Sequence, residues 1–177
     1  TGEKVRFLFT GRYERRKGIE ELTKVLKKWL PENPAIEFHF VGPVPDKKKI
    51  KHAAVIYHGA VTEQEKLRSL YREAQVLVCP SYSEGMPNVI LEAMASGCMV
   101  IATVVGATCL LVNNKTGILI PPADSDALAA AVRSVMTMSA ETRMLLRTEA
   151  LKSVKENYLW KTVIQQVIAA IEKRINN

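Results

Sequence analysis

The chain has 177 residues, of which 47% are hydrophobic and 24% are charged. These values are ordinary for a folded globular protein and exclude intrinsic disorder and fibrous repeats. At roughly 100–200 residues per domain, the length predicts a single domain with a sizeable core. The longest apolar runs fall far short of the ~20 residues that cross a bilayer, so the sequence predicts no transmembrane segment.

The formal net charge of +7 is concentrated in the first third of the chain. Residues 1–51 contain 13 basic and 7 acidic side chains, which leaves 12 and 11 for the remainder. Such a positive field attracts nucleic acid, an anionic membrane surface or a phosphorylated small molecule without selecting among them. Nucleic acid is disfavoured, because aromatic side chains should then be interleaved with the basic ones and only Tyr13 is so placed.

Cysteine usage indicates a reducing, cytoplasmic compartment. Cys79, Cys98 and Cys109 form neither a C-x-x-C pair nor an even set, and two of them lie in apolar segments where a thiol packs as a small hydrophobe. The chain begins at Thr1 without a methionine, and no basic stretch leads into an apolar targeting region. We therefore expect a fragment of a longer protein.

Short strands and helices are predicted to alternate along the chain. Runs of β-branched and aromatic residues that end at Gly or Pro predict strands over 4–10, 36–41, 55–57, 76–79, 99–103 and 118–120. Apolar residues at helical spacing predict helices over 19–30, 62–74, 88–96, 142–156 and 160–175, with another that starts at about residue 124. Thr62 with Glu65 forms a capping box, Gly97 ends the third helix, and Asp124 caps the fourth.

This alternation indicates an α/β fold, a Rossmann-like open parallel sheet with helices on both faces. Residues 1–177 form one such domain, with only helices after about residue 124. In such sheets, ligands bind beyond the carboxyl ends of the strands. Chemistry is therefore expected in the loops that follow Thr10, Val41, Tyr57, Cys79 and Thr103.

The first of these loops, Gly11–Gly18, is rich in basic residues. Arg12 and Lys17 lie between a strand end and a helix start, where unpaired N–H groups and a partial positive charge favour an anion. The loop matches neither a Walker A sequence nor the G-x-G-x-x-G dinucleotide fingerprint. A solvated basic turn is the alternative, and the strand-to-helix position favours phosphate.

The second segment, Ser81–Gly97, combines two carboxylates with a glycine and a proline at a helix start. Gly85 permits a backbone shape that aims N–H groups at an anion, and Pro87 suits the first helical turn. Glu92 follows Glu84 by eight residues and lies in an otherwise apolar helix, where its carboxylate needs a partner such as a sugar or ribose diol. Alternatively, Glu92 pairs with a basic residue and Glu84 is a charge favoured by the helix dipole.

Together these segments resemble the C-terminal, donor-binding domain of a family 4 retaining glycosyltransferase with the GT-B fold. The resemblance covers nearly the whole chain and rests on motifs in register: Gly11-Arg12, Lys17-Gly18, Val41-Gly42, His58-Gly59, Leu70-Tyr71, Pro80-Ser81, Ser83–Gly97, Lys115-Thr116-Gly117 and Pro121-Pro122. It implies hexosyl transfer from a nucleotide diphosphate sugar to an acceptor hydroxyl in polysaccharide biosynthesis, without a metal or other cofactor. The acceptor, a saccharide or lipid-linked sugar, would bind a missing N-terminal domain.

The resemblance also assigns roles to residues. Arg12 and Lys17 would hold the diphosphate and offset the charge on the leaving group, Glu84 would contact the transferred sugar, and Glu92 would bind the ribose. The catalytic set is then Arg12, Lys17 and Glu84, and the donor-binding set is Gly11, Gly85, Met86, Pro87, Asn88, Val89 and Glu92.

One departure from the family pattern concerns the loop that reads Gly106-Ala107-Thr108-Cys109, where the family commonly carries a glutamate at the position of Cys109. This difference puts the sugar contacts of that loop in doubt. It mildly favours an alternative hypothesis, in which the domain is a non-catalytic nucleotide-binding module that has lost transfer activity.

Two further features concern surfaces. We interpret the run Lys47–Lys49 as a solvated loop. The alternative is that it makes peripheral contact with the inner membrane surface. Tyr158–Trp160 interrupts the terminal helical region, so Trp160 is either partly uncovered or part of the core. In full-length relatives, the resemblance implies, the last helix crosses back onto the N-terminal domain.

Overall fold

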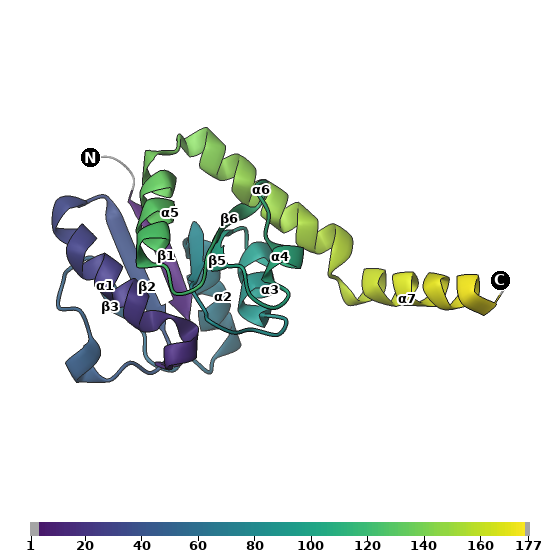
Figure 1. Ribbon diagram of the computed structural model, residues 1–177, viewed down its shortest axis with the longest axis horizontal. Coiled ribbons are helices and arrows are strands. Elements are labelled where there is room, and N and C mark those ends of the chain that lie inside the picture. Colours follow the sequence, from purple (N-terminus) through teal and green to yellow (C-terminus); the bar gives the residue numbers. More distant parts are fainter. Residues whose placement is uncertain (1–3, 176–177) are drawn as a thin grey trace.

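The computed structural model describes residues 4–175. A parallel sheet with the strand order β3-β2-β1-β4-β5-β6 forms its centre (Figure 1). The strands are β1 (Val5–Thr10), β2 (Ile36–Val41), β3 (Val55–Tyr57), β4 (Val76–Cys79), β5 (Met99–Thr103) and β6 (Gly117–Ile120). This arrangement confirms the predicted Rossmann-like fold.

Helices cover both faces of the sheet. They are α1 (Ile19–Trp29), α2 (Gln64–Glu73), α3 (Asn88–Ala95), α4 (Thr108–Leu111), α5 (Ser125–Thr137), α6 (Ala140–Asn157) and α7 (Trp160–Ile175). Helices α1 and α5 pack on one face, and α2, α3 and α6 contribute to the core on the other.

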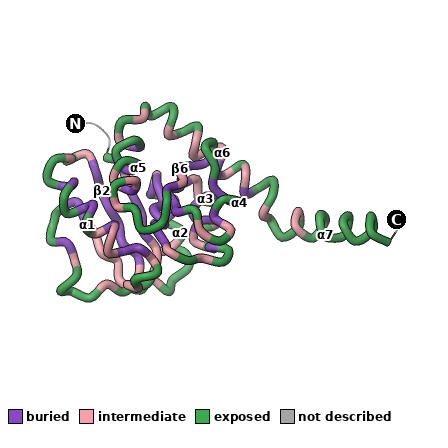
Figure 2. The backbone as a smooth tube through the Cα atoms, viewed as in Figure 1, coloured by how far each residue is buried: buried purple, intermediate pink, exposed green. Residues whose placement is uncertain are grey.

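Side chains that alternate along the central strands divide the core between the two faces. In Figure 2 the buried stretches of the backbone run through the centre of the domain. Phe7 of β1 stacks on Phe38 of β2 beneath α1, whereas Leu8 points to the face covered by α2 and α3. Every residue of β4 and β5 is buried. Each fully buried Phe or Leu contributes about 1.5–3 kcal/mol through the hydrophobic effect, so the central strands anchor the loops at their carboxyl ends.

One local prediction is wrong, and one short helix was not predicted. Thr62 does not cap α2, because the helix begins at Gln64 and its cap position is Glu63, whose backbone is extended and whose side chain accepts no capping hydrogen bond. The short helix α4 was not expected, since four residues are too few to show helical periodicity. The Asp124 cap is confirmed: its side chain accepts a hydrogen bond from the Ala127 N–H at 2.8 Å.

The last helix, α7, extends away from the rest of the domain (Figure 1). None of its residues is buried, and Trp160 is 81% exposed. Of the two expectations for Trp160, the structure therefore supports the uncovered one.

Two histidines meet near the carboxyl ends of β2 and β3. His39 Nδ1 lies 2.9 Å from His58 Nε2, and His39 Nε2 lies 3.1 Å from Glu37 Oε1. A hydrogen bond between two imidazoles requires one N–H and one lone pair, so two protonated rings cannot form it. Burial, assisted by His39, lowers the pKa of His58.

Close backbone packing joins the loops at the carboxyl edge of the sheet. Gly18 has a φ of +65°, and a Cβ there would lie 1.9 Å from the Pro80 carbonyl oxygen. Gly106 has a φ of +52°, and its Cβ would lie 1.9 Å from the Glu84 carbonyl oxygen. The loops after β1, β4 and β5 therefore touch through positions that only glycine can occupy.

Gly18→Ala should therefore destabilise the domain by about 2–4 kcal/mol, because left-handed strain and a clash with backbone act together. Gly59 provides the matched control: its φ is +67°, yet nothing lies within 4 Å of a Cβ there. Gly59→Ala should cost only about 1–2 kcal/mol. Urea unfolding measures the free energy of unfolding of both variants. Equal losses of stability would show that the close approach of Gly18 to Pro80 is not a constraint.

Stability should also decline as the pH falls from about 7 to 5. Because the pKa of His58 is lower in the folded state than its unfolded value of about 6.5, the unfolded chain takes up the proton first. Urea unfolding at pH 7, 6 and 5 should show a smaller decline for His58→Gln than for the wild type. The exposed His52 serves as the control, and a His58→Gln decline as steep as that of His52→Gln would contradict the assignment.

Candidate functional site

The loop between β1 and α1 forms one side of the site. It contains the 3-10 helix Arg15–Lys17 and ends at Gly18, from which α1 begins. The Tyr82 N–H donates to the Arg16 carbonyl oxygen at 2.7 Å, which ties this loop to the loop after β4. No described side chain caps α1, but Glu20 and Glu21 lie in its first turn and partly offset the positive charge of its free N–H groups.

Lys17 and Glu84, expected to serve a phosphate and a sugar, are in direct contact. Lys17 Nζ lies 2.7 Å from Glu84 Oε1, and the two side chains are 17% and 8% exposed. Ser81 Oγ donates to the same carboxylate oxygen at 2.7 Å. Two loops that are 67 residues apart in the sequence thus meet at one partly buried ion pair.

Arg12, unlike Lys17, has no close ion-pair partner. Its side chain is 80% exposed, and its Nη1 lies 3.8 Å from Glu14 Oε1. The other oxygen of Glu14 is 2.7 Å from Arg16 Nε. Arg12 lines a cavity of about 520 Å³ that the loops after β1, β2 and β3 enclose. The backbone of its neighbour Gly11 is fixed, because the Gly11 N–H donates to the Val41 carbonyl oxygen at 2.9 Å.

The loop that carries Glu84 is supported by the loop after β5. The Ala107 N–H donates to the Gly85 carbonyl oxygen at 3.0 Å. Met86, the next residue, is 48% exposed. The hydrogen bond from Ala107 therefore fixes the backbone beside Glu84, while the Met86 side chain remains partly open to solvent.

Helix α3 starts directly after this loop. Pro87 occupies the cap position, one residue before the first turn in which it was expected, and Asn88 and Val89 are the first helical residues. No described side chain caps the helix, and the Ile90 N–H donates to the Pro87 carbonyl oxygen at 3.0 Å. The first turn of α3 contains no acidic residue, so this helix start is suited to an anion.

Glu92 does not join the Lys17–Glu84 contact. It lines a cavity of about 400 Å³ between α2 and α3, and its Oε2 accepts a hydrogen bond from the Tyr71 hydroxyl at 2.9 Å. Burial raises the pKa of Tyr71, so the phenol remains protonated and acts as the donor. The partner of this carboxylate is therefore a phenol rather than the basic residue considered above.

Sequence reasoning missed the roles of Ser81 and Tyr71. Ser81 follows Pro80 at the end of a buried strand, a position that could have marked it as part of the site. Tyr71 lies within a predicted helix, and nothing in the sequence links its hydroxyl to Glu92. Cys109, at the position where the family commonly carries glutamate, is exposed, with its Sγ 3.9 Å from the Gly106 carbonyl oxygen.

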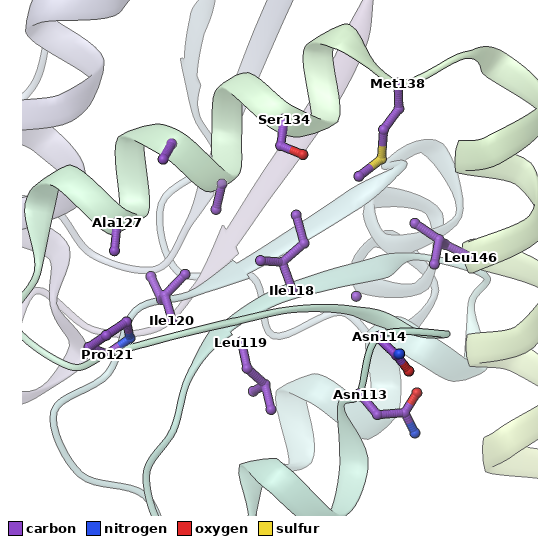
Figure 3. A pocket seen from close by; sticks show the side chains of 13 residues that line it. Asn113, Asn114, Ile118, Leu119, Ile120, Pro121, Ala127, Ser134, Met138 and Leu146 are labelled. Atoms are coloured by element: carbon purple, nitrogen blue, oxygen red, sulfur yellow. The ribbon is translucent and has the colours of Figure 1, made fainter.

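A cavity of about 710 Å³ lies elsewhere, between β6, α5 and α6 (Figure 3). Ile118, Ile120 and Met138 give it an apolar lining, and none of the expected site residues lines it. Within residues 4–175, no three His, Cys, Asp or Glu side chains are grouped so as to hold a metal ion. In the same range, no helix is both long enough and apolar enough to cross a membrane.

Comparison with known proteins identifies the family. The family of glycosyl transferases group 1 matches residues 4–138. The chain is 36% identical over 125 residues to the putative teichuronic acid biosynthesis glycosyltransferase TuaC of Bacillus subtilis, covering 71% of this chain and 31% of that protein. It is 30% identical over 170 residues to the uncharacterized glycosyltransferase MJ1607 of Methanocaldococcus jannaschii, covering 91% and 43%. The chain thus spans less than half the length of these relatives.

Solved structures of related proteins have the same fold as this chain. The C-terminal domain of LpcC, a glycosyl transferase group 1 protein from Francisella tularensis, is 25% identical with a TM-score of 0.79, covering 89% of this chain and 88% of that one. Anabaena HepE, solved with UDP, shares the fold at 18% identity with a TM-score of 0.80, covering 97% and 49%. The chain belongs to the group 1 glycosyl transferases and has the fold of the C-terminal domain of a GT-B enzyme.

Proposed function

We propose that this domain binds a nucleotide diphosphate sugar and forms the donor half of a retaining glycosyltransferase. The enzyme would move a hexosyl group from the nucleotide to an acceptor hydroxyl. Membership of the group 1 family supports glycosyl transfer in general. The observation that supports the more specific proposal is the contact between Lys17 and Glu84, because in this proposal the first would bind phosphate and the second the adjoining sugar.

The electrostatics favour a diphosphate. Lys17, the exposed Arg12 and the start of α3, which has no acidic residue in its first turn, provide positive charge at the carboxyl edge of the sheet. When the bond to the sugar breaks, negative charge grows on the leaving nucleoside diphosphate. Preorganised cations and N–H dipoles stabilise that charge. In this proposal they perform the work without a metal ion.

Hydroxyl groups on either side of the diphosphate would meet the two carboxylates. A carboxylate only accepts hydrogen bonds, so it pairs well with a sugar hydroxyl or a ribose diol. Glu84 would contact the transferred sugar, and Glu92 would bind the ribose. Gly11, Gly85, Met86, Pro87, Asn88 and Val89 complete the proposed donor site.

The acceptor would bind outside this domain. The chain spans 31% and 43% of the two relatives described above, and we propose that an N-terminal domain binds an acceptor saccharide or lipid-linked sugar. Transfer depends on holding both reactants in one geometry. The isolated domain should therefore bind donor but transfer poorly.

A second candidate function is a nucleotide-binding module without transfer activity. Cys109 favours it, because a thiol at the glutamate position cannot accept sugar hydrogen bonds as a carboxylate does. A transfer assay of the full-length protein with radiolabelled donor separates the two functions. Donor binding without transfer would support the second.

The donor proposal is tested by calorimetric titration with UDP, GDP and ADP and with UDP-glucose, GDP-mannose and ADP-glucose. One nucleotide should bind preferentially. Lys17→Ala should lower the affinity for that nucleotide by about tenfold or more, because a charge-assisted hydrogen bond contributes about 1.5–3 kcal/mol. Glu92→Ala should weaken it by about tenfold through the ribose contact.

Exposed residues away from the site provide the controls. Lys24→Ala on α1 and Glu156→Ala on α6 remove the same charges and should leave affinity within about twofold. Failure of every nucleotide to bind, or equal losses in control and site variants, would overturn the assignment of the donor site.

A further inference from the structure

We propose that Ser81 is a positioning residue that holds Glu84 toward the transferred sugar while Lys17 engages the diphosphate. This inference rests on the proposed function and adds a residue to its site. Ser81 is 1% exposed and lies one residue beyond Pro80, which follows the end of β4 at Cys79. Its hydroxyl donates to Glu84, so it would act through that carboxylate rather than on the ligand.

The hydrogen bonds to Glu84 distinguish its two oxygens. Oε1 accepts from Ser81 Oγ and from Lys17 Nζ, both at 2.7 Å. Within the part of the chain that the structure describes, no hydrogen bond reaches Oε2. The first oxygen therefore fixes the orientation of the carboxylate, and the second is left to accept a hydroxyl from a ligand.

Ser81 is itself held by buried groups. The Thr103 hydroxyl donates to the Ser81 carbonyl oxygen, and the Thr108 hydroxyl donates to the Thr103 carbonyl oxygen at 2.6 Å. Cys79 Sγ lies 3.7 Å from Ser81 Oγ. Because the single hydroxyl proton of Ser81 is used on Glu84, the Cys79 thiol is the donor in this contact. Ser81 thus has a fixed direction and an assigned proton.

The two donors to Glu84 respond differently to a ligand. A diphosphate attracts the Lys17 ammonium and competes with Glu84 for it. The Ser81 hydroxyl is neutral, buried and bound to the scaffold, so it has no comparable attraction to phosphate. When Lys17 turns to the diphosphate, Ser81 is the donor that keeps Glu84 in place.

Ser81→Ala separates the sugar contact from the phosphate contact. Calorimetry would compare each nucleoside diphosphate with its sugar conjugates, using UDP, GDP and ADP, UDP-glucose, UDP-galactose, UDP-N-acetylglucosamine, GDP-mannose and ADP-glucose. The diphosphate alone should bind Ser81→Ala within about twofold of the wild type, whereas the preferred conjugate should bind about tenfold more weakly. Ser83→Ala, at an exposed position in the same loop, should change neither affinity.

Two further variants distinguish positioning from a general structural role. In a Glu84→Ala background, Ser81→Ala should cause no additional loss of conjugate affinity, because its effect passes through that carboxylate. Ser81→Cys, measured with a reducing agent because Cys79 is adjacent, replaces the hydroxyl by a slightly larger thiol that is a weaker donor. It should show a smaller loss of the same kind, and it replaces Ser81→Ala if alanine prevents folding.

The outcomes separate this inference from the proposed function. If no diphosphate binds the wild type, the proposed function fails and the role of Ser81 fails with it. If diphosphates bind but the sugar adds no affinity, or if Ser81→Ala weakens diphosphate and conjugate equally, the donor domain stands and the positioning role is overturned.

Discussion

The contact between Lys17 and Glu84 depends on how closely the loops at the carboxyl edge of the sheet approach one another. Because all neighbouring strands are parallel, their carboxyl ends share one edge, and the loops that leave them must stack. A Cβ at Gly18 would lie 1.9 Å from the Pro80 carbonyl oxygen and would push the first two loops apart. The absence of that one atom allows an ion pair of 2.7 Å between residues 67 positions apart.

The two cations of the site differ in what ligand binding demands of them. Lys17 is already ordered by Glu84, so binding a phosphate exchanges one anionic partner for another. Arg12 is 80% exposed, and holding it against a ligand costs up to about 2 kcal/mol of side-chain entropy. Lys17 therefore supplies a preorganised charge, whereas the planar guanidinium of Arg12 supplies paired hydrogen bonds once it is recruited.

The sequence predicted the scaffold better than the contacts between loops. Strand boundaries such as those of β2 and β5 followed from β-branched runs and from glycine or proline, which are local signals. The pairing of Lys17 with Glu84 was not predicted, because it depends on which loops are adjacent. The Tyr71 hydroxyl could not be assigned to Glu92 for the same reason: its helix was recognisable, but the direction of its side chain depends on the packing of α2 against α3.

The placement of the two carboxylates constrains the shape of the ligand. Glu84 lies in the loop before α3, and Glu92 lies four residues after the helix start at Asn88, which is about 6 Å along the axis at ~1.5 Å per residue. The helix start, which favours an anion, lies between them in the sequence. A free sugar would donate hydroxyl hydrogen bonds to only one of the carboxylates, and a simple phosphate would donate to neither. The ligand proposed above, a nucleotide diphosphate sugar, has hydroxyl groups on both sides of a central anion and so would match all three groups.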